Sequence, residues 1–247
     1  MTRLRRRLAP PFPACFVAGL FAFALSACSL PEATIQLGSS LSILPAHSSF
    51  AVDELPDDWF THGTIPADKV SASASLGSSS LSVSSAHTPF LVARRVRANL
   101  HATPYLSWRW RVEPGKWQYH PVRLVVGFSG GGGTPADPSV FARLFPGSAI
   151  PAYDRVISFV WAPSALMRGT LVQLPSQPEL REAQYMVRGG MENVGRWWPE
   201  TVDLAALYRR SWPDDRINAT RIAFIGVSAA PSTPAFQAYL ADLQLSR

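Results

Sequence analysis

A segment near the middle of the chain, Tyr105–Val112, alternates between apolar and polar side chains from Leu106 onward. Successive side chains of a β-strand point to opposite faces, so this pattern predicts a strand that is buried on one face only. The apolar face carries Leu106, Trp108, Trp110 and Val112, and the polar face carries Ser107, Arg109 and Arg111. Two tryptophans on one face favour a place in the core of a layered β-structure.

Further segments have strand character, and clusters of proline and glycine separate most of them. They are residues 90–96, 122–128, 156–161, 171–174, 183–188, 222–227 and 238–245. Helical signals occur at 139–145 and at 201–211, where Thr201 is a candidate cap. We therefore predict an all-β fold: an antiparallel, jelly-roll-like (galactose-binding-like) β-sandwich with one or two short helices.

The N-terminal residues have the layout of a bacterial export signal. Arginines at positions 3, 5, 6 and 7 precede an apolar stretch at 16–25, and Leu25-Ser26-Ala27-Cys28 matches the lipobox of bacterial lipoproteins. The apolar stretch is shorter than the roughly 20 residues of a spanning helix. We expect a signal peptide at 1–27, a palmitate-type acylated Cys28 that begins a flexible tether at 28–50, and a sandwich domain at 51–247. A first edge strand at the end of the tether is left open. The alternatives are an ordinary signal peptide or an uncleaved anchor.

This signal implies a lipid-anchored protein of the cell envelope. Ser29, rather than Asp, follows the cysteine, which favours the outer membrane of a Gram-negative cell. Four of the 23 basic residues lie in the signal, so 19 basic and 17 acidic residues remain in the mature chain. That near-neutral balance argues against nucleic acid as a partner. The oligomeric state stays open.

The sequence contains few residues in the spacing of a known catalytic or metal-binding site. Cys15 lies in the signal and Cys28 is the acylation site, so no cysteine remains for a disulfide or a thiolate metal site. The five histidines lack metal-binding spacing, and we expect neither a metal nor another cofactor. Glycoside hydrolysis needs two acids close together, and Glu200 and Asp242 are the acids we consider for it. Strand alternation points Asp242 away from Tyr239, toward solvent, within reach of an arginine on a neighbouring strand.

Two groups of residues are candidates for ligand binding. Arg109, Arg111 and Arg123 would form a cationic floor if the outward sheet face were concave, because guanidinium groups match carboxylates and phosphates. The alternative is that these arginines are only solvated. Trp197 and Trp198 lie in a predicted loop, and two adjacent side chains of an extended segment cannot both face inward. One tryptophan would then be an exposed platform for a sugar or a partner, unless the loop covers both rings.

Several of these segments resemble the DUF3047 family, which comprises exported bacterial domains of unknown function. The Tyr105–Val112 segment carries the resemblance most specifically. Other similar segments are 121–128, 158–161, Gly195-Arg196-Trp197 with Glu200, 207–210, 221–227 and 238–243. The chain departs from the family at Ser129 and at 228–233, where the resemblance leads us to expect acidic residues. Such acidic loops would suit a cation or polar ligand, so their loss implies a divergent member with an altered site.

These observations together predict a non-catalytic module of the envelope. It would bind a glycan, a lipid or a protein through Arg109, Arg111, Arg123, Trp197, Trp198 and Asp242. The alternatives are a hydrolase that acts on glycans through acids such as Glu200 or Asp242, and a structural subunit of an envelope complex.

Overall fold

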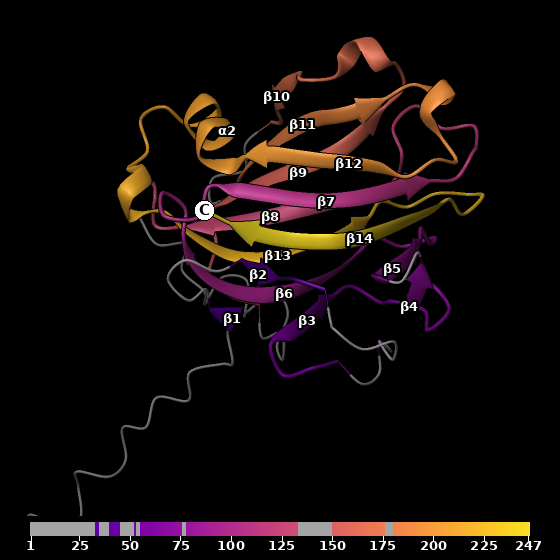
Figure 1. The fold of residues 1–247 in the computed structure, drawn as a ribbon, viewed down its shortest axis with the longest axis horizontal. Coiled ribbons are helices and arrows are strands. Elements are labelled where there is room, and N and C mark those ends of the chain that lie inside the picture. The colour runs from indigo at the N-terminus through magenta and orange to yellow at the C-terminus, as the bar shows by residue number, and fades with distance from the viewer. Residues whose placement is uncertain are drawn as a thin grey trace, which may run out of the picture. The chain divides into compact units, whose positions relative to one another are not determined.

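The computed structural model of the chain describes residues 33–34, 40–44, 52, 55–75, 78–132, 150–175 and 180–247 (Figure 1). All of them belong to one compact unit, Pro31–Arg247. The predicted signal peptide, Cys28 and the predicted helix at 139–145 lie outside the described residues. Within the described part of the chain, no helix has the length and apolar character needed to cross a membrane.

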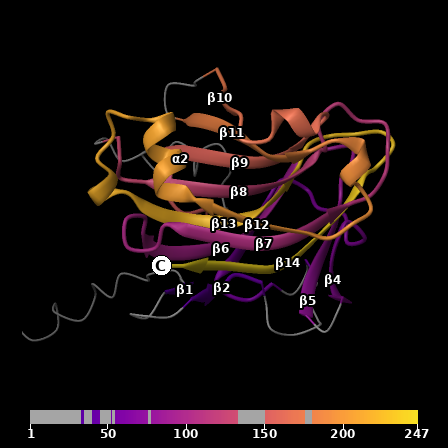
Figure 2. The same cartoon turned by 45° about the horizontal axis from the view of Figure 1, so that its top comes forward.

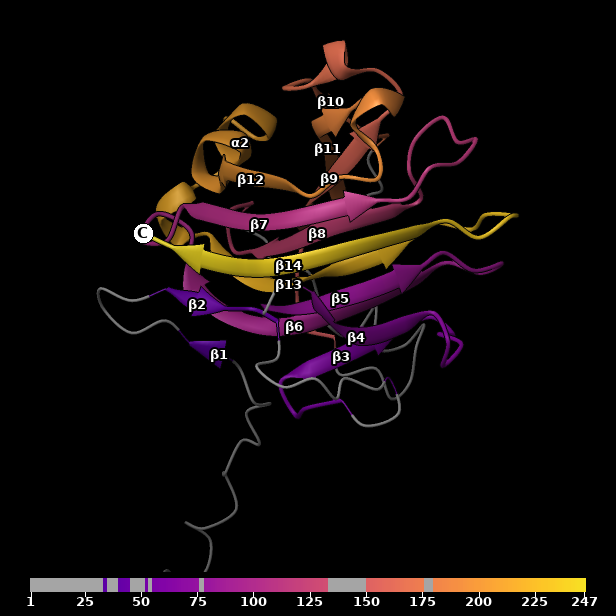
Figure 3. The same ribbon diagram turned by 45° about the vertical axis from the view of Figure 1, so that its right-hand side comes forward.

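The described strands form two sheets that pack face to face (Figure 3). In the eight-stranded sheet the order is β1 (Ala33–Thr34), β6 (Phe90–Asn99), β13 (Arg221–Ala229), β8 (Val122–Ser129), β9 (Arg155–Ala162), β11 (Arg181–Gly189) and β10 (Leu171–Gln173), and β3 (Trp59–His62) also pairs with β6. Figure 2 shows this order from β10 at the top to β6 below. In the six-stranded sheet the order is β12 (Trp198–Asp203), β7 (Tyr105–Val112), β14 (Gln237–Ser246), β5 (Ser78–Ser84) and β4 (Val70–Ser75), and β2 (Leu41–Ser42) also pairs with β14.

The core lies between the two sheets, and the predicted faces of β7 are confirmed. Its side chains alternate between buried and half-buried from Leu106 to Val112. The rings of Trp108 and Trp110 reach across to the other sheet, where they contact Phe159 and Trp161 with centroid distances of 5.4 and 5.3 Å. Each such aromatic pair contributes about 1 kcal/mol beyond the burial of its area. The predicted fold class, a jelly-roll-like all-β sandwich, is confirmed.

Two strand pairs differ from the antiparallel arrangement that we predicted. β1 runs parallel to β6, and β9 runs parallel to β11. The connection from β9 to β11 passes through the short 3₁₀ turn η2 (Ala165–Met167) and β10, which is antiparallel to β11. Because the chain reverses once into β10 and again into β11, β11 runs in the same direction as β9.

The sandwich begins before residue 51, where we had placed its start. β1 and β2 both lie in the segment predicted to be a tether, and each pairs with a strand of the sandwich. Ile43 and Leu44, just after β2, are buried in the core. Apolar side chains in this serine-rich segment therefore contribute to the sandwich, which agrees with the open alternative of an edge strand at the end of the tether.

The predicted helix at 201–211 is shorter than expected. Residues from Trp198 to Asp203 form β12, whose backbone pairs with β7, and α2 (Leu204–Ser211) starts only afterwards. Asp203, not Thr201, caps the helix, because its Oδ1 accepts a hydrogen bond from the backbone nitrogen of Ala206 at 2.8 Å. Two further 3₁₀ turns are η3 (Met191–Asn193) and η4 (Ile217–Ala219).

Candidate functional site

Two of the predicted arginines lie on the outward face of the six-stranded sheet, turned away from the core. Figure 1 shows β7 and β14 of this sheet toward the viewer. Arg109 and Arg111 lie on β7, opposite Ala241 and Tyr239 of β14. Cross-strand partners share a sheet face, so Tyr239 lies beside the arginines. The guanidinium carbon of Arg111 is 4.4 Å from the centroid of the Tyr239 ring. The sequence analysis missed Tyr239, because only the pairing of β7 with β14 brings it to this face.

Trp197 completes this cluster from the turn just before β12. Its ring centroid lies 5.8 Å from the guanidinium carbons of both Arg109 and Arg111, and 6.4 Å from the ring of Tyr239. Both aromatic side chains are half-buried, which leaves part of each ring accessible. We call Arg109, Arg111, Trp197 and Tyr239 the aromatic–arginine face. Its cations lie on β7, and its rings come from β14 and from the turn before β12; β7 pairs with both β12 and β14.

Two carboxylates accompany the arginines. Asp242 accepts from Nε of Arg109 at 2.5 Å, and Glu113 lies 2.8 Å from a terminal nitrogen of Arg111. The side chain of Asp242 is 42% exposed and that of Glu113 is 35% exposed. Exposed ion pairs of this kind contribute only about 0–1 kcal/mol. An anionic ligand can therefore replace either acid at little cost.

Asp242 reaches this face through a β-bulge. Ala241 pairs with Arg109 and Gln244 pairs with Ser107, so the register of β14 shifts by one residue between them. Asp242 lies within the bulge and has a φ of 51°. Strand alternation had predicted that Asp242 and Tyr239 point to opposite faces, and this is wrong, because the extra residue interrupts the alternation. The predicted bridge to an arginine on a neighbouring strand is confirmed.

Arg123 and Trp198 do not join the aromatic–arginine face. Arg123 lies on β8 of the other sheet, where its neighbours Val122 and Leu124 point into the core, so Arg123 points outward from the opposite side of the sandwich. The single cationic floor that we predicted is therefore not formed. Trp198 is the first residue of β12 rather than part of a loop. Its indole nitrogen donates to the carbonyl of Asn193 at 2.8 Å, and Arg188 stacks 4.1 Å from its ring centroid.

Glu200 lies inside the sandwich, opposite Trp108 in the pairing of β12 with β7. Its side chain is only 1% exposed and accepts hydrogen bonds from Nε of Arg188, from Arg168 at 3.3 Å and from the indole of Trp110 at 3.4 Å. Because Glu200 faces the core and Asp242 faces outward, the six-stranded sheet separates the two acids. They do not form the paired carboxylates that glycoside hydrolysis requires.

A second group of acids surrounds Arg155 at the end of β9. Asp215 accepts from two nitrogens of Arg155 at 2.8 and 3.0 Å, and Asp154 accepts from a third at 3.2 Å. The Tyr208 hydroxyl donates to Asp215 at 2.8 Å. Burial raises the pKa of Asp154, whereas the adjacent Arg155 lowers it. This network ties α2 to β9. Asp154 and Arg155 are far in the sequence from Tyr208 and Asp215, so no local signal predicted it.

The described residues contain no group of three or more His, Cys, Asp or Glu side chains placed to share a metal ion. The segment 228–233, where we expected an acidic turn from the family resemblance, forms the end of β13 and the start of the connection to β14. It carries serine, alanine, proline and threonine instead of acids.

Solved structures with a similar fold include glycan-acting enzymes whose sequence identity to this chain is low. The Trichoderma harzianum endoglucanase 3 of family GH12 is 9% identical, with a TM-score of 0.41 over 72% of this chain and 81% of that protein. The xyloglucanase domain of NopAA from Sinorhizobium fredii is 10% identical, with a TM-score of 0.41 over 82% and 99%. The family 12 xyloglucanase from Bacillus licheniformis is 8% identical, with a TM-score of 0.38 over 84% and 99%.

No curated protein matches the sequence. The model of the family described as "Protein of unknown function (DUF3047)" matches residues 63–243. That range includes β7, β12 and the part of β14 up to residue 243, and with them all four residues of the aromatic–arginine face. The chain therefore belongs to the DUF3047 family.

Proposed function

We propose that the sandwich is a non-catalytic module that binds an acidic glycan of the cell envelope on the aromatic–arginine face. In this proposal an acylated Cys28 anchors the chain to the outer membrane of a Gram-negative bacterium. The module acts by holding a polymer near the membrane surface.

One observation carries the proposal: the Trp197 ring lies 5.8 Å from two guanidinium carbons at once. An aromatic ring offers an apolar surface to the C–H face of a sugar. A guanidinium group binds a carboxylate through two parallel hydrogen bonds. Both features on neighbouring strands suit a sugar that carries a carboxylate, such as a uronic acid.

The rigidity of the support strengthens the argument. Arg109 and Arg111 lie within β7, which is hydrogen-bonded on both sides by β12 and β14. Trp108 and Trp110, which alternate with the arginines, are packed into the core. A binding group on such a strand loses little conformational freedom when its ligand arrives.

The arrangement of acids favours binding over hydrolysis. Glu200 is enclosed by Arg188, Arg168 and Trp110, and the acid on the outward face, Asp242, has an arginine rather than a second carboxylate as its partner. A glycosidase requires two carboxylates close together, and the six-stranded sheet separates Glu200 from Asp242.

The test is calorimetric binding of the full-length chain, in detergent, to polygalacturonate and to the neutral polymer dextran. We expect polygalacturonate alone to bind, and Trp197→Ala and Arg111→Gln each to weaken binding about tenfold or more. Arg123→Gln is the matched control, because it removes an identical charge from the other sheet.

Equal affinity of all three variants and the wild type would reject this surface. Release of reducing ends from the polymer would show a hydrolase instead. Binding to vesicles that contain anionic lipids, but to neither polymer, would show that the ligand is a lipid.

A further inference from the structure

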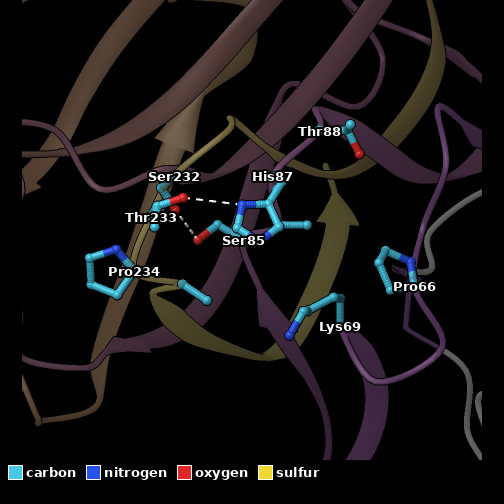
Figure 4. A pocket seen from close by; sticks show the side chains of 10 residues that line it. Pro66, Lys69, Ser85, His87, Thr88, Ser232, Thr233 and Pro234 are labelled. Carbon is cyan, nitrogen blue, oxygen red and sulfur yellow. Dashed lines mark hydrogen bonds between the residues drawn. The ribbon is translucent and has the colours of Figure 1, made fainter.

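A separate cavity of about 350 Å³ lies where three connections meet at one end of the sandwich (Figure 4). Its walls come from Pro66 and Lys69 before β4, residues 85–88 between β5 and β6, and residues 232–235 between β13 and β14. Loops gathered at the end of a β-sandwich are a common place for binding sites, because the strands hold them in position. A cavity of this volume is at the lower end of the range for small-molecule sites, which suits a ligand the size of one sugar.

Backbone hydrogen bonds tie these walls to one another. The amide of Ser84 donates to the carbonyl of Lys69 at 2.8 Å, Ser85 donates to Phe236 at 2.9 Å, and Ser232 donates to Ala86 at 2.9 Å. These bonds link all three connections across long distances in the sequence. The cavity is therefore already shaped before any ligand enters.

Apolar prolines and alanines form much of the cavity lining, together with hydroxyl groups and two nitrogen-bearing side chains, and none of the ten lining residues is acidic. The hydroxyls of Ser85 and Ser232 are 2.5 Å apart, and Nδ1 of His87 is 3.1 Å from the Thr233 hydroxyl, which orients both pairs (Figure 4). Lys69 contributes the positive charge. Hydroxyls that both donate and accept hydrogen bonds fit a hydroxylated ligand, and an ammonium group fits an anion.

Asp68 is an anionic neighbour of Lys69: its carboxylate lies 2.7 Å from Nζ, and its side chain is 71% exposed. This hydrogen bond with Lys69 lowers the pKa of Asp68. An exposed pair between adjacent residues is weak, so a ligand anion can compete for the ammonium group. Ser232 and Thr233 belong to the segment 228–233, whose lack of acids leaves this wall without charges that would repel an anion.

We propose that this cavity binds a small organic anion the size of a monosaccharide, with a carboxylate or a phosphate on a hydroxylated skeleton. Lys69 takes the anionic group, and His87 with the hydroxyls of Thr88, Ser232 and Thr233 takes the hydroxyl groups. Ser85, whose hydroxyl also bonds to the backbone of Phe236, holds Ser232 in place. This site is distinct from the aromatic–arginine face and does not depend on its function.

Calorimetric titration of the full-length chain in detergent tests the proposal with three probes: glucuronate, glucose 6-phosphate and uncharged glucose. We expect at least one anion to bind, and glucose to bind at least about tenfold more weakly. A preference for glucuronate assigns the site to carboxylates, and a preference for glucose 6-phosphate assigns it to phosphates.

Two variants connect binding to the cavity. Lys69→Gln should weaken binding of the anion about tenfold, and Ala235→Trp should abolish it, because Ala235 is an exposed lining residue whose enlargement fills the cavity. Lys116→Gln is the matched control, since Lys116 is an exposed lysine that does not line the cavity. An unchanged thermal midpoint shows that each variant is folded.

Three results would overturn the proposal. They are no binding of either anion, equal binding of glucose and the anions, and equal losses in Lys69→Gln and Lys116→Gln. None of these results bears on polygalacturonate binding by the aromatic–arginine face, which is measured with different variants.

Discussion

Arg188 of β11 donates a hydrogen bond to Glu200 of β12, which joins the two sheets inside the sandwich. Both side chains are almost fully buried, at 10% and 1% exposed. Removal of one partner of a buried ion pair leaves the other charge without compensation, and this usually costs about 3–5 kcal/mol. The pair is therefore a structural connection between the sheets.

We predict that Glu200→Gln lowers the free energy of unfolding by about 3 kcal/mol or more, because Arg188 loses its counter-charge in the core. Asp242→Asn, which removes an acid from the exposed pair with Arg109, should cost less than about 1 kcal/mol. Denaturant unfolding monitored by tryptophan fluorescence measures both variants. Similar small losses in the two variants would contradict the structural role of Glu200.

We predict that the bulge at Asp242 restricts which residues are accepted there. A φ of 51° is unfavourable for β-branched residues and is tolerated by Asn and Gly. Asp242→Val should therefore be about 1–2 kcal/mol less stable than Asp242→Asn, since both lack the carboxylate and differ in backbone preference. The control is Gln244→Val at an exposed position of the same strand. Equal stability of Asp242→Val and Asp242→Asn would argue against the bulge.

We predict that His120 makes the fold sensitive to acid. His120 is fully buried against Trp117, and burial lowers its pKa to about 4, although backbone hydrogen bonds partly oppose this shift. In the unfolded chain its pKa is about 6.5. Above that pH both states are neutral and the stability is complete. As the pH falls from about 6.5 to about 4, only the unfolded state gains the proton, so stability is lost by up to about 3 kcal/mol.

Denaturant unfolding at about pH 7.5 and about pH 4.5 tests this, with His120→Asn as the comparison. Asparagine keeps an acceptor near the position of Nδ1, which accepts from the amide of Val122 at 3.2 Å. The wild type should lose more stability between the two pH values than the variant does. The same pH dependence in both proteins would mean that other groups determine it.

We predict that Cys28 carries the lipid anchor. Each buried methylene of an acyl chain contributes about 0.8 kcal/mol to membrane binding, so several chains hold the protein firmly. Mass spectrometry should find an acylated Cys28 at the mature N-terminus, and Cys28→Ser should leave the membrane fraction or remain uncleaved. Cys15→Ser, within the signal, should change neither result. An unmodified residue at position 28 would refute the anchor.

Local sequence patterns predicted the fold well where the position of a residue along a strand decides which sheet face its side chain points to. The alternation in β7 placed Trp108 in the core and Arg109 outside, as the structure does. The same rule was wrong for Asp242, because a bulge is a property of the pairing between two strands. The helix predicted from Thr201 was also wrong at its start, because Thr201 pairs with β7 as part of β12.

The amino-acid sequence by itself determined the alternating strands and the composition of the arginine-bearing surface of β7, because side-chain direction along a strand is local. Only the tertiary structure decided which residues join that surface. Tyr239 and Trp197 reach the arginines through strand pairing across more than eighty residues of sequence, and Arg123 is placed on the opposite sheet. Strand order depends on the packing of the whole core, so no segment of the sequence carries it alone.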